Sequence, residues 1–179
     1  DIESNNTDYT NQDLTITVSF EEGLTDNRKV MFRAEGSNET VEMNASGTNE
    51  KGTEYIISTN GVIYAEATDR VGNKVFTDYT IGNIDKEDPE IIIELNGANL
   101  VIGTGEDVAT IRTNVETSDN NWIEDAKYAF LQENLDVDNI TSEQKEKISN
   151  KLNYEAKIEN AKSGTYYLYV LAEDPAGNE

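Results

Sequence analysis

Three acidic residues, Asp85, Glu87 and Asp88, stand within four consecutive positions and are candidates to hold a metal ion. Hard cations such as Ca²⁺ take six to eight oxygen ligands, so these carboxylates would need further oxygens from neighbouring residues. The alternative is a solvated run of charge in a linker. The sequence favours the solvated run, so we expect no cofactor and keep calcium at these residues as the weaker hypothesis.

A second set of polar residues occurs twice, as Asp69 with Asn73 and as Asp174 with Asn178. Each pair has a glycine directly before the asparagine. Asp and Asn side chains bond to nearby backbone in turns, and a Gly-Asn pair tolerates positive φ. A ligand site is the alternative, but turn chemistry explains the spacing better, so we expect two structural turns.

The chain contains neither histidine nor cysteine. The commonest general base, the usual zinc ligand, thiol catalysis and disulfide bonds are therefore excluded. The run Asp136–Asn139 resembles the start of an EF-hand loop but lacks the central glycine, and Lys147 stands where a glutamate is required. We predict no catalytic residue and no enzyme.

The net charge is −22, from 36 acidic and 14 basic residues. Residues 1–86 carry 16 acidic and 7 basic residues (−9), and residues 87–179 carry 20 and 7 (−13). Such a chain repels phosphate backbones and anionic lipid surfaces, so neither nucleic acid nor membrane insertion is expected. The charge also favours solubility, and we expect a monomer.

The spacing of the two turn sequences indicates an internal repeat. They are 105 residues apart (174 − 69), which predicts two copies of one module, residues 1–86 and 87–179. Residues 82–89 read as a short polar linker. Pro89 holds the preceding residue extended, so the linker is expected to be stiff.

Apolar residues alternate with polar ones in most of the remaining sequence, which is typical of half-buried strands. The predicted strands end before each turn sequence, and the first copy continues with a further strand at Lys74–Ile81. The ranges expected as strands are Leu14–Phe20, Lys29–Glu35, Glu54–Ser58, Gly61–Thr68, Glu90–Leu95, Ala109–Val115, Lys127–Gln132, Tyr154–Ile158 and Thr165–Glu173. Residues 1–12 are expected to be a frayed terminus or a weak edge strand.

The second copy is about ten residues longer than the first, and the extra residues predict a short helix at Ser142–Leu152. Thr141 and Gln144 fit a capping box. Ile140, Ile148 and Leu152 would pin the helix to the edge of the sandwich. We also expect that the chain is a piece of a longer polypeptide and that the second module lacks its last strand.

The sequence around Tyr166 resembles the F strand of immunoglobulin-like domains. Gly164 precedes Tyr166 by two residues, as in the tyrosine corner, and Leu168 stands where immunoglobulins have a cysteine. In the first copy Ile63 and Ala65 hold these positions. The wider pattern, with Asp-x-x-Gly-Asn before a strand and Ile-Asp-Lys-x-x-Pro at residues 84–89, resembles bacterial immunoglobulin-like repeats of cell-surface and secreted proteins.

The expected fold is therefore all-β, with two tandem immunoglobulin-like antiparallel sandwiches and a helical insertion in the second. The resemblance implies an extracellular, cell-surface or secreted setting, which we expect to be in a Gram-positive bacterium. Its expected partners are other domains of the same polypeptide. Trp122 is expected to pack in the core, with a sugar-stacking platform as the alternative.

Two roles remain open for such a pair of modules. The first is a structural spacer or stalk. The second is an adhesin or carbohydrate-binding accessory that recognises a host protein or a glycan. A calcium-stiffened adhesin linker is a third, weaker hypothesis.

Overall fold

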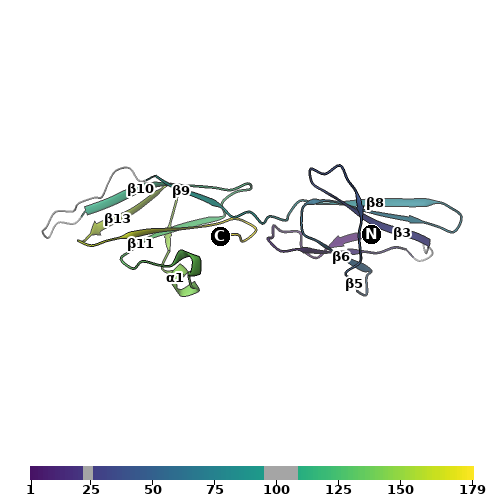
Figure 1. Ribbon diagram of the computed structural model, residues 1–179, viewed down its shortest axis with the longest axis horizontal. Helices are drawn as coiled ribbons and strands as arrows, with labels where there is room; N and C mark the ends of the chain where they lie inside the picture. Colours follow the sequence, from purple (N-terminus) through teal and green to yellow (C-terminus); the bar gives the residue numbers. More distant parts are fainter. Residues whose placement is uncertain (22–25, 95–108) are drawn as a thin grey trace. The chain divides into compact units, whose positions relative to one another are not determined.

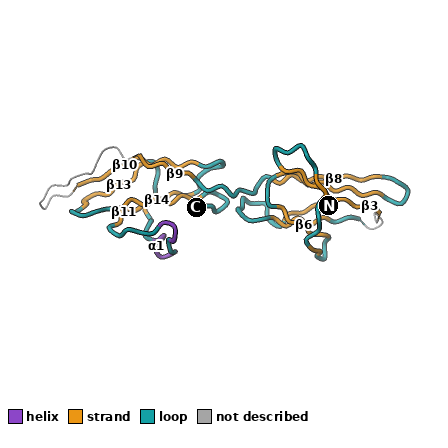
Figure 2. Tube along the Cα trace, in the orientation of Figure 1, coloured by secondary structure: helices purple, strands orange, loops and turns teal. Residues whose placement is uncertain are grey.

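The computed structural model describes residues 1–21, 26–94 and 109–179, and the chain divides into two compact units, Asp1–Lys86 and Glu87–Glu179. Each unit consists of two antiparallel sheets (Figures 1 and 2). The prediction of an all-β chain built from immunoglobulin-like sandwiches is confirmed. Among the described residues, no helix is both long and apolar enough to cross a membrane.

The first unit pairs two four-stranded sheets. One has the order β1-β2-β6-β5 and the other β4-β3-β7-β8. These are the strand orders A-B-E-D and C-F-G of an immunoglobulin sandwich, with β4 as an additional edge strand. The strands are β1 (Ile2–Ser4), β2 (Leu14–Val18), β3 (Asp26–Ala34), β4 (Val41–Glu42), β5 (Gly47–Thr48), β6 (Thr53–Ile57), β7 (Gly61–Thr68) and β8 (Lys74–Ile81).

Period-two alternation builds the core of the first unit, as the sequence predicts. In β2, Leu14, Ile16 and Val18 are at most 1% exposed, whereas the threonines between them are half-buried. Burying each such side chain contributes about 1.5–3 kcal/mol. The residues that complete this core are Val30, Tyr55, Ile57, Ile63, Ala65, Ile81 and Ile84.

The second unit pairs two three-stranded sheets, with the orders β13-β10-β9 and β12-β11-β14. The first sheet corresponds to strands E, B and A of an immunoglobulin sandwich. The second corresponds to strands C and F, with β12 as an additional edge strand. Of the predicted strand Glu90–Leu95, Leu95 lies outside the described residues. The strands are β9 (Glu90–Glu94), β10 (Ala109–Ser118), β11 (Asp125–Leu131), β12 (Asn150–Lys151), β13 (Glu155–Ala161) and β14 (Tyr167–Glu173).

Tyr166 forms the predicted tyrosine corner of the second unit. Its hydroxyl accepts a hydrogen bond of 3.2 Å from the backbone N–H of Lys162, four residues upstream. Leu168, in the cysteine position, packs against the inner core with Val115 and Tyr128. Apolar packing thus takes the place of the inter-sheet disulfide.

The predicted helix is present but shorter than expected. A 3₁₀ turn, η1 (Val137–Asn139), precedes α1 (Ser142–Glu146), whose capping box has both reciprocal bonds between Thr141 and Gln144. The predicted range continued to Leu152. The chain leaves the helix earlier because Asn150 and Lys151 pair with β11 as strand β12.

The inserted segment packs on the outer face of the sheet that contains β11 and β14, and not at the sandwich edge as predicted (Figure 1). Alternate residues of these strands point to opposite faces, so Ala129 and Tyr169 face outward. Leu135 and Ile148 cover them and form a second, smaller core. Leu152 instead joins the inner core.

Candidate functional site

The two repeated turns have nearly identical hydrogen bonds, which confirms the structural interpretation of their Asp and Asn residues. The Asp69 carboxylate accepts from the backbone N–H groups of Val71 and Asn73, at 2.9 and 2.8 Å, and from the Asn73 side chain at 2.8 Å. These bonds hold the pKa of Asp69 below its ordinary value, with the side-chain bond from Asn73 as the largest cause. Asp69 therefore stabilises the turn as a carboxylate.

Asp174 makes the same contacts in the second unit. Its carboxylate accepts from the backbone N–H groups of Ala176 and Asn178, both at 2.8 Å, and from the Asn178 side chain at 2.7 Å. The difference is burial: Asp174 is 1% exposed, whereas the Asp69 turn is exposed to solvent. A buried carboxylate needs such compensation, since burying a charge without partners is costly.

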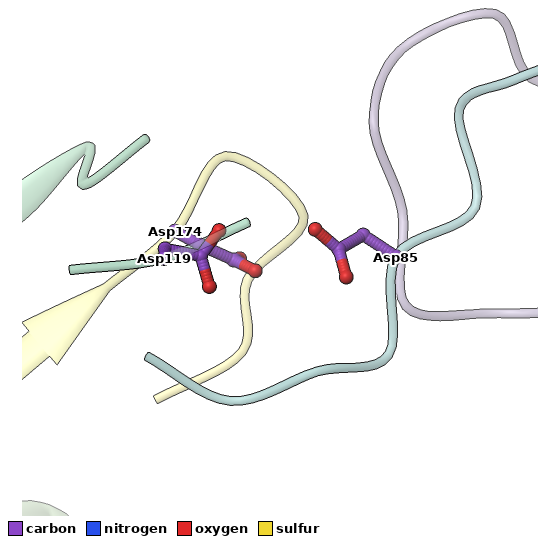
Figure 3. Close-up of side chains that lie close together, drawn as sticks. All are labelled: Asp85, Asp119 and Asp174. Atoms are coloured by element: carbon purple, nitrogen blue, oxygen red, sulfur yellow. The ribbon is translucent and has the colours of Figure 1, made fainter. Parts of the chain in front are cut away.

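A second aspartate of the same unit, Asp119, lies beside Asp174 (Figure 3). It follows β10 directly, and one of its carboxylate oxygens lies within 4.8 Å of one from Asp174. Asp119 Oδ1 accepts from the Asn121 N–H at 2.9 Å, while Oδ2 is buried and has no hydrogen-bond partner among the described residues. Two close carboxylates and an unsatisfied oxygen are an arrangement that a hard cation would stabilise.

Asp119 was not predicted from the sequence as a candidate metal ligand, although the expected strand order contains a signal for it. Asp119 lies in the loop between strands B and C, and Asp174 in the turn after strand F. These loops meet at the same end of an immunoglobulin sandwich. The strand order therefore places the two aspartates at the same end of the sandwich. In the sequence they are 55 residues apart (174 − 119), so their spacing gives no sign that they are neighbours.

The three predicted calcium candidates belong to different parts of the chain. Asp85 is the second-last residue of the first unit, and its backbone N–H donates to the Thr10 carbonyl oxygen at 2.9 Å. Glu87 and Asp88 begin the second unit, and both are exposed. Calcium at these residues remains a prediction. Among the described residues of the second unit, Asp119 and Asp174 are placed to share a hard cation.

The residues that precede this boundary are fastened to the first unit. The Asn60 side chain bonds Ile84 twice, accepting from its N–H at 2.9 Å and donating to its carbonyl oxygen at 2.8 Å. Thr10 donates to the Asn83 carbonyl oxygen and accepts from Asp85, each at 2.9 Å. Ile84 is 7% exposed within the core. Of the predicted linker, only residues 86–89 separate these contacts from β9.

The prediction that Trp122 packs in the core is wrong. Its side chain is 48% exposed, and its indole N–H donates to the Glu124 carboxylate at 3.2 Å. It lies in the connection between β10 and β11, where the neighbouring Ile123 packs against the core instead. An aromatic ring on a surface loop is able to stack on a ligand, such as a sugar.

The fold defines the chain as a tandem pair of immunoglobulin-like β-sandwiches. No protein-family model matches the sequence, and no curated protein matches it either. Among solved structures, the chain is similar to the fibronectin(III)-like modules of Clostridium thermocellum CbhA, with 13% identity and a TM-score of 0.37. That alignment covers 99% of this chain and 87% of the other. A TM-score this low is not evidence that the two proteins share a function.

Proposed function

We propose that this chain is a non-catalytic pair of immunoglobulin-like modules that acts as an extracellular spacer within a larger bacterial surface or secreted protein. A spacer keeps one module at a defined place relative to the next. The connection between the modules must therefore be short and restricted in its conformations. The observation that supports this role is the fastening of residues 83–85 to the first unit.

Two sets of contacts fasten these residues. Asn60 satisfies both backbone polar groups of Ile84, whose side chain is part of the hydrophobic core. Thr10 holds the residues on either side of Ile84. The remaining connection, residues 86–89, ends in Pro89, which restricts the conformation of the residue before it. A connection of this kind limits the directions that the next module can take.

The charge of the chain also suits a spacer. Both units carry a net negative charge, −9 and −13, so neighbouring copies repel one another at separations up to about 8–10 Å at physiological ionic strength. Such repulsion keeps closely spaced stalks apart.

The spacer role is tested by measuring the spread of distances between the two units. The chain has no cysteine, so Glu42→Cys and Ser149→Cys introduce two unique, exposed sites for spin labels. We expect a narrow distance distribution by double electron–electron resonance. Asn60→Ala should broaden it, because this change removes both side-chain bonds to Ile84.

Asn44→Ala provides the matched control, since Asn44 is exposed and lies far along the chain from residues 83–85. It should leave the distribution unchanged. A second control replaces residues 86–89 with glycine and serine. If the unmodified chain gives a distribution as broad as this variant, the spacer proposal is wrong.

The exposed Trp122 favours a second candidate function, a module that binds a glycan or a host protein. Trp122 lies on a loop of a rigid sandwich, and such loops often carry recognition. A glycan array with the whole chain would detect this activity. Binding that Trp122→Ala abolishes, while Tyr154→Ala at the more exposed Tyr154 leaves it intact, would establish the binding function.

A further inference from the structure

Asn60 is followed directly by Gly61, at the start of β7. The side-chain amide of an asparagine in such a pair is open to attack by the backbone nitrogen of the glycine, because glycine has no side chain to hinder the approach. The nitrogen bonds to the asparagine Cγ, its proton passes through solvent to the leaving amide group, and ammonia departs. Water then opens the resulting succinimide ring to aspartate or isoaspartate. The sequence has a second such pair, Asn96 and Gly97, which lies outside the described residues.

Packing requires the glycine of this pair. A Cβ atom at residue 61 would lie 2.9 Å from Ala34 Cα and 2.7 Å from Phe32 Cζ. It would lie closer still to the Arg33 carbonyl oxygen. Glycine within a strand is typical of a place where another backbone approaches closely. Gly61 is therefore required by the approach of β3 to β7.

The asparagine of the pair is required for a different reason. Asn60 Oδ1 accepts from the Ile84 N–H at 2.9 Å, and Asn60 Nδ2 donates to the Ile84 carbonyl oxygen at 2.8 Å. An amide group offers an acceptor and a donor together, whereas a carboxylate offers acceptors alone. The fastening of residues 83–85 thus places an asparagine directly before a glycine that cannot be replaced.

The same bonds protect the pair while they are intact. The two bonds to Ile84 hold the side-chain amide of Asn60, and the Asn60 carbonyl oxygen accepts from the Glu35 N–H at 2.9 Å. Gly61 is paired on both sides, with β3 and with β8. Ring closure requires the side chain of Asn60 and its peptide bond with Gly61 to rotate, so the reaction must wait for local opening of these contacts.

We propose that Asn60 is a site of spontaneous deamidation, which reacts when residues 83–85 detach from the first unit. Neither product restores the fastening. Aspartate has no donor for the Ile84 carbonyl oxygen, and isoaspartate adds a methylene group to the backbone directly before β7. Detachment therefore becomes permanent, and residues 83–85 are added to the free length of the connection. The reaction does not depend on the spacer role, so the two proposals can fail separately.

The test incubates the whole chain in mildly alkaline buffer, and peptide mapping by mass spectrometry measures aspartate and isoaspartate at residue 60. In urea, Asn60 should react as fast as Asn96, because glycine follows both. In the folded chain Asn60 should react at least about tenfold more slowly than in urea, since local opening comes first. Ile84→Ala removes a buried anchor of the detaching segment and should speed the folded-state reaction at least about tenfold.

Ile16→Ala is the matched control. Ile16 belongs to the same core as Ile84 but lies on β2, away from the fastened residues in the sequence. It should speed the reaction much less than Ile84→Ala. The proposal is overturned if the two variants speed it equally, because the reaction would then follow unfolding of the whole unit. It is also overturned if Asn60 stays unreacted in folded Ile84→Ala.

A second measurement needs no substitution. The isoaspartate form of the unmodified chain is separated by chromatography, and its hydrogen exchange is compared with that of the starting chain. The amides of Ile84 and Asp85, which donate to Asn60 Oδ1 and to the Thr10 carbonyl oxygen, should exchange at least about tenfold faster. The amide of Ile16 should be unaffected. Unchanged exchange at Ile84 and Asp85 would overturn the proposal.

Discussion

The aspartates of the two repeated turns act mainly through their carboxylates, which accept hydrogen bonds from backbone N–H groups. Asp69 and Asp174 each hold a turn closed with a carboxylate that accepts three hydrogen bonds from the following residues. Bonds to an ionised carboxylate are stronger than those between neutral groups. Their contribution to stability therefore depends on the ionisation of the aspartate.

For Asp69 this dependence has a definite sign. The pKa of Asp69 is lowered in the folded chain, chiefly by the Asn73 side chain. Its carboxylate thus adds stability that is present above the ordinary Asp pKa, about 3.9, and is lost as the pH falls through the lower folded value. Urea unfolding from pH 6 to pH 2 should show that Asp69→Asn destabilises the first unit at pH 6 and has progressively less effect at acidic pH.

Asp78→Asn is the matched control, because Asp78 is an exposed carboxylate on β8 outside the turn. It should not reproduce the pH-dependent difference. A cost of Asp69→Asn that is the same at pH 2 as at pH 6 would mean that the charge of Asp69 does not support the turn.

The pair Asp119 and Asp174 gives a second prediction at this scale. Asp119→Asn removes one of two close negative charges, so it should raise the thermal transition of the second unit in EDTA. If the pair holds Ca²⁺, millimolar calcium should stabilise the unmodified chain, by about 2.7 kcal/mol at a concentration of 100 Kd, and should not stabilise the variant.

Calorimetry with and without calcium measures both effects, and Asp138→Asn in the exposed 3₁₀ turn is the control. A transition that neither calcium nor EDTA moves would exclude a cation at this pair. The charge effect of Asp119→Asn in EDTA would still report on the repulsion between the two aspartates.

At the scale of elements, the helical insertion is anchored by one hydroxyl group. Tyr169 on β14 accepts a hydrogen bond of 2.6 Å from the backbone N–H of Leu135, in a buried position. Its hydroxyl also lies 3.3 Å from the Glu133 carbonyl oxygen. Leu135 and Ile148 then pack around the ring. The hydroxyl therefore fixes the start of the insertion to the outer face of the sheet.

Tyr169→Phe should loosen the insertion while leaving the sandwich intact. It leaves the buried N–H of Leu135 without its partner, which costs about 1–3 kcal/mol. Hydrogen exchange should show faster exchange in residues 133–149, and urea unfolding should show the loss of stability. Tyr167→Phe, two residues earlier on β14 and half exposed, is the control and should have little effect. Unchanged protection of residues 133–149 in Tyr169→Phe would contradict this anchoring.

At the scale of the whole molecule, each unit has its own hydrophobic core. The core of the first unit contains Ile16 and Ile63, and that of the second contains Val115 and Ala156. Because these clusters share no residue, we expect the two units to unfold in separate transitions.

Ile16→Ala tests this independence. Ile16 is fully buried, so the change should destabilise the first unit by about 2–5 kcal/mol and leave the second transition in place. Differential scanning calorimetry measures both transitions in one scan. Ile56→Ala, at a residue that is 55% exposed on the neighbouring β6, should have a much smaller effect. A parallel shift of both transitions in Ile16→Ala would show that the units unfold together.

The sequence alone was sufficient for the features that depend on neighbouring residues. Alternation in Leu14–Val18 and Gly61–Thr68 predicted strands and their buried faces, because successive side chains of a strand point to opposite sides. The Asp-x-x-Gly-Asn spacing predicted both turns, and Thr141 with Gln144 predicted the start of the helix. Each of these depends on residues within about one turn or strand.

Only the tertiary structure decided what distant residues do together. It paired Asp119 with Asp174, fastened Ile84 to Asn60 and Thr10, and put Ile148 on the outer face of a sheet. It also left Trp122 exposed and Ile93 uncovered. The physical reason is that hydrophobic attraction has no direction and no fixed partner in the sequence. The order of the strands in space determines which residues meet.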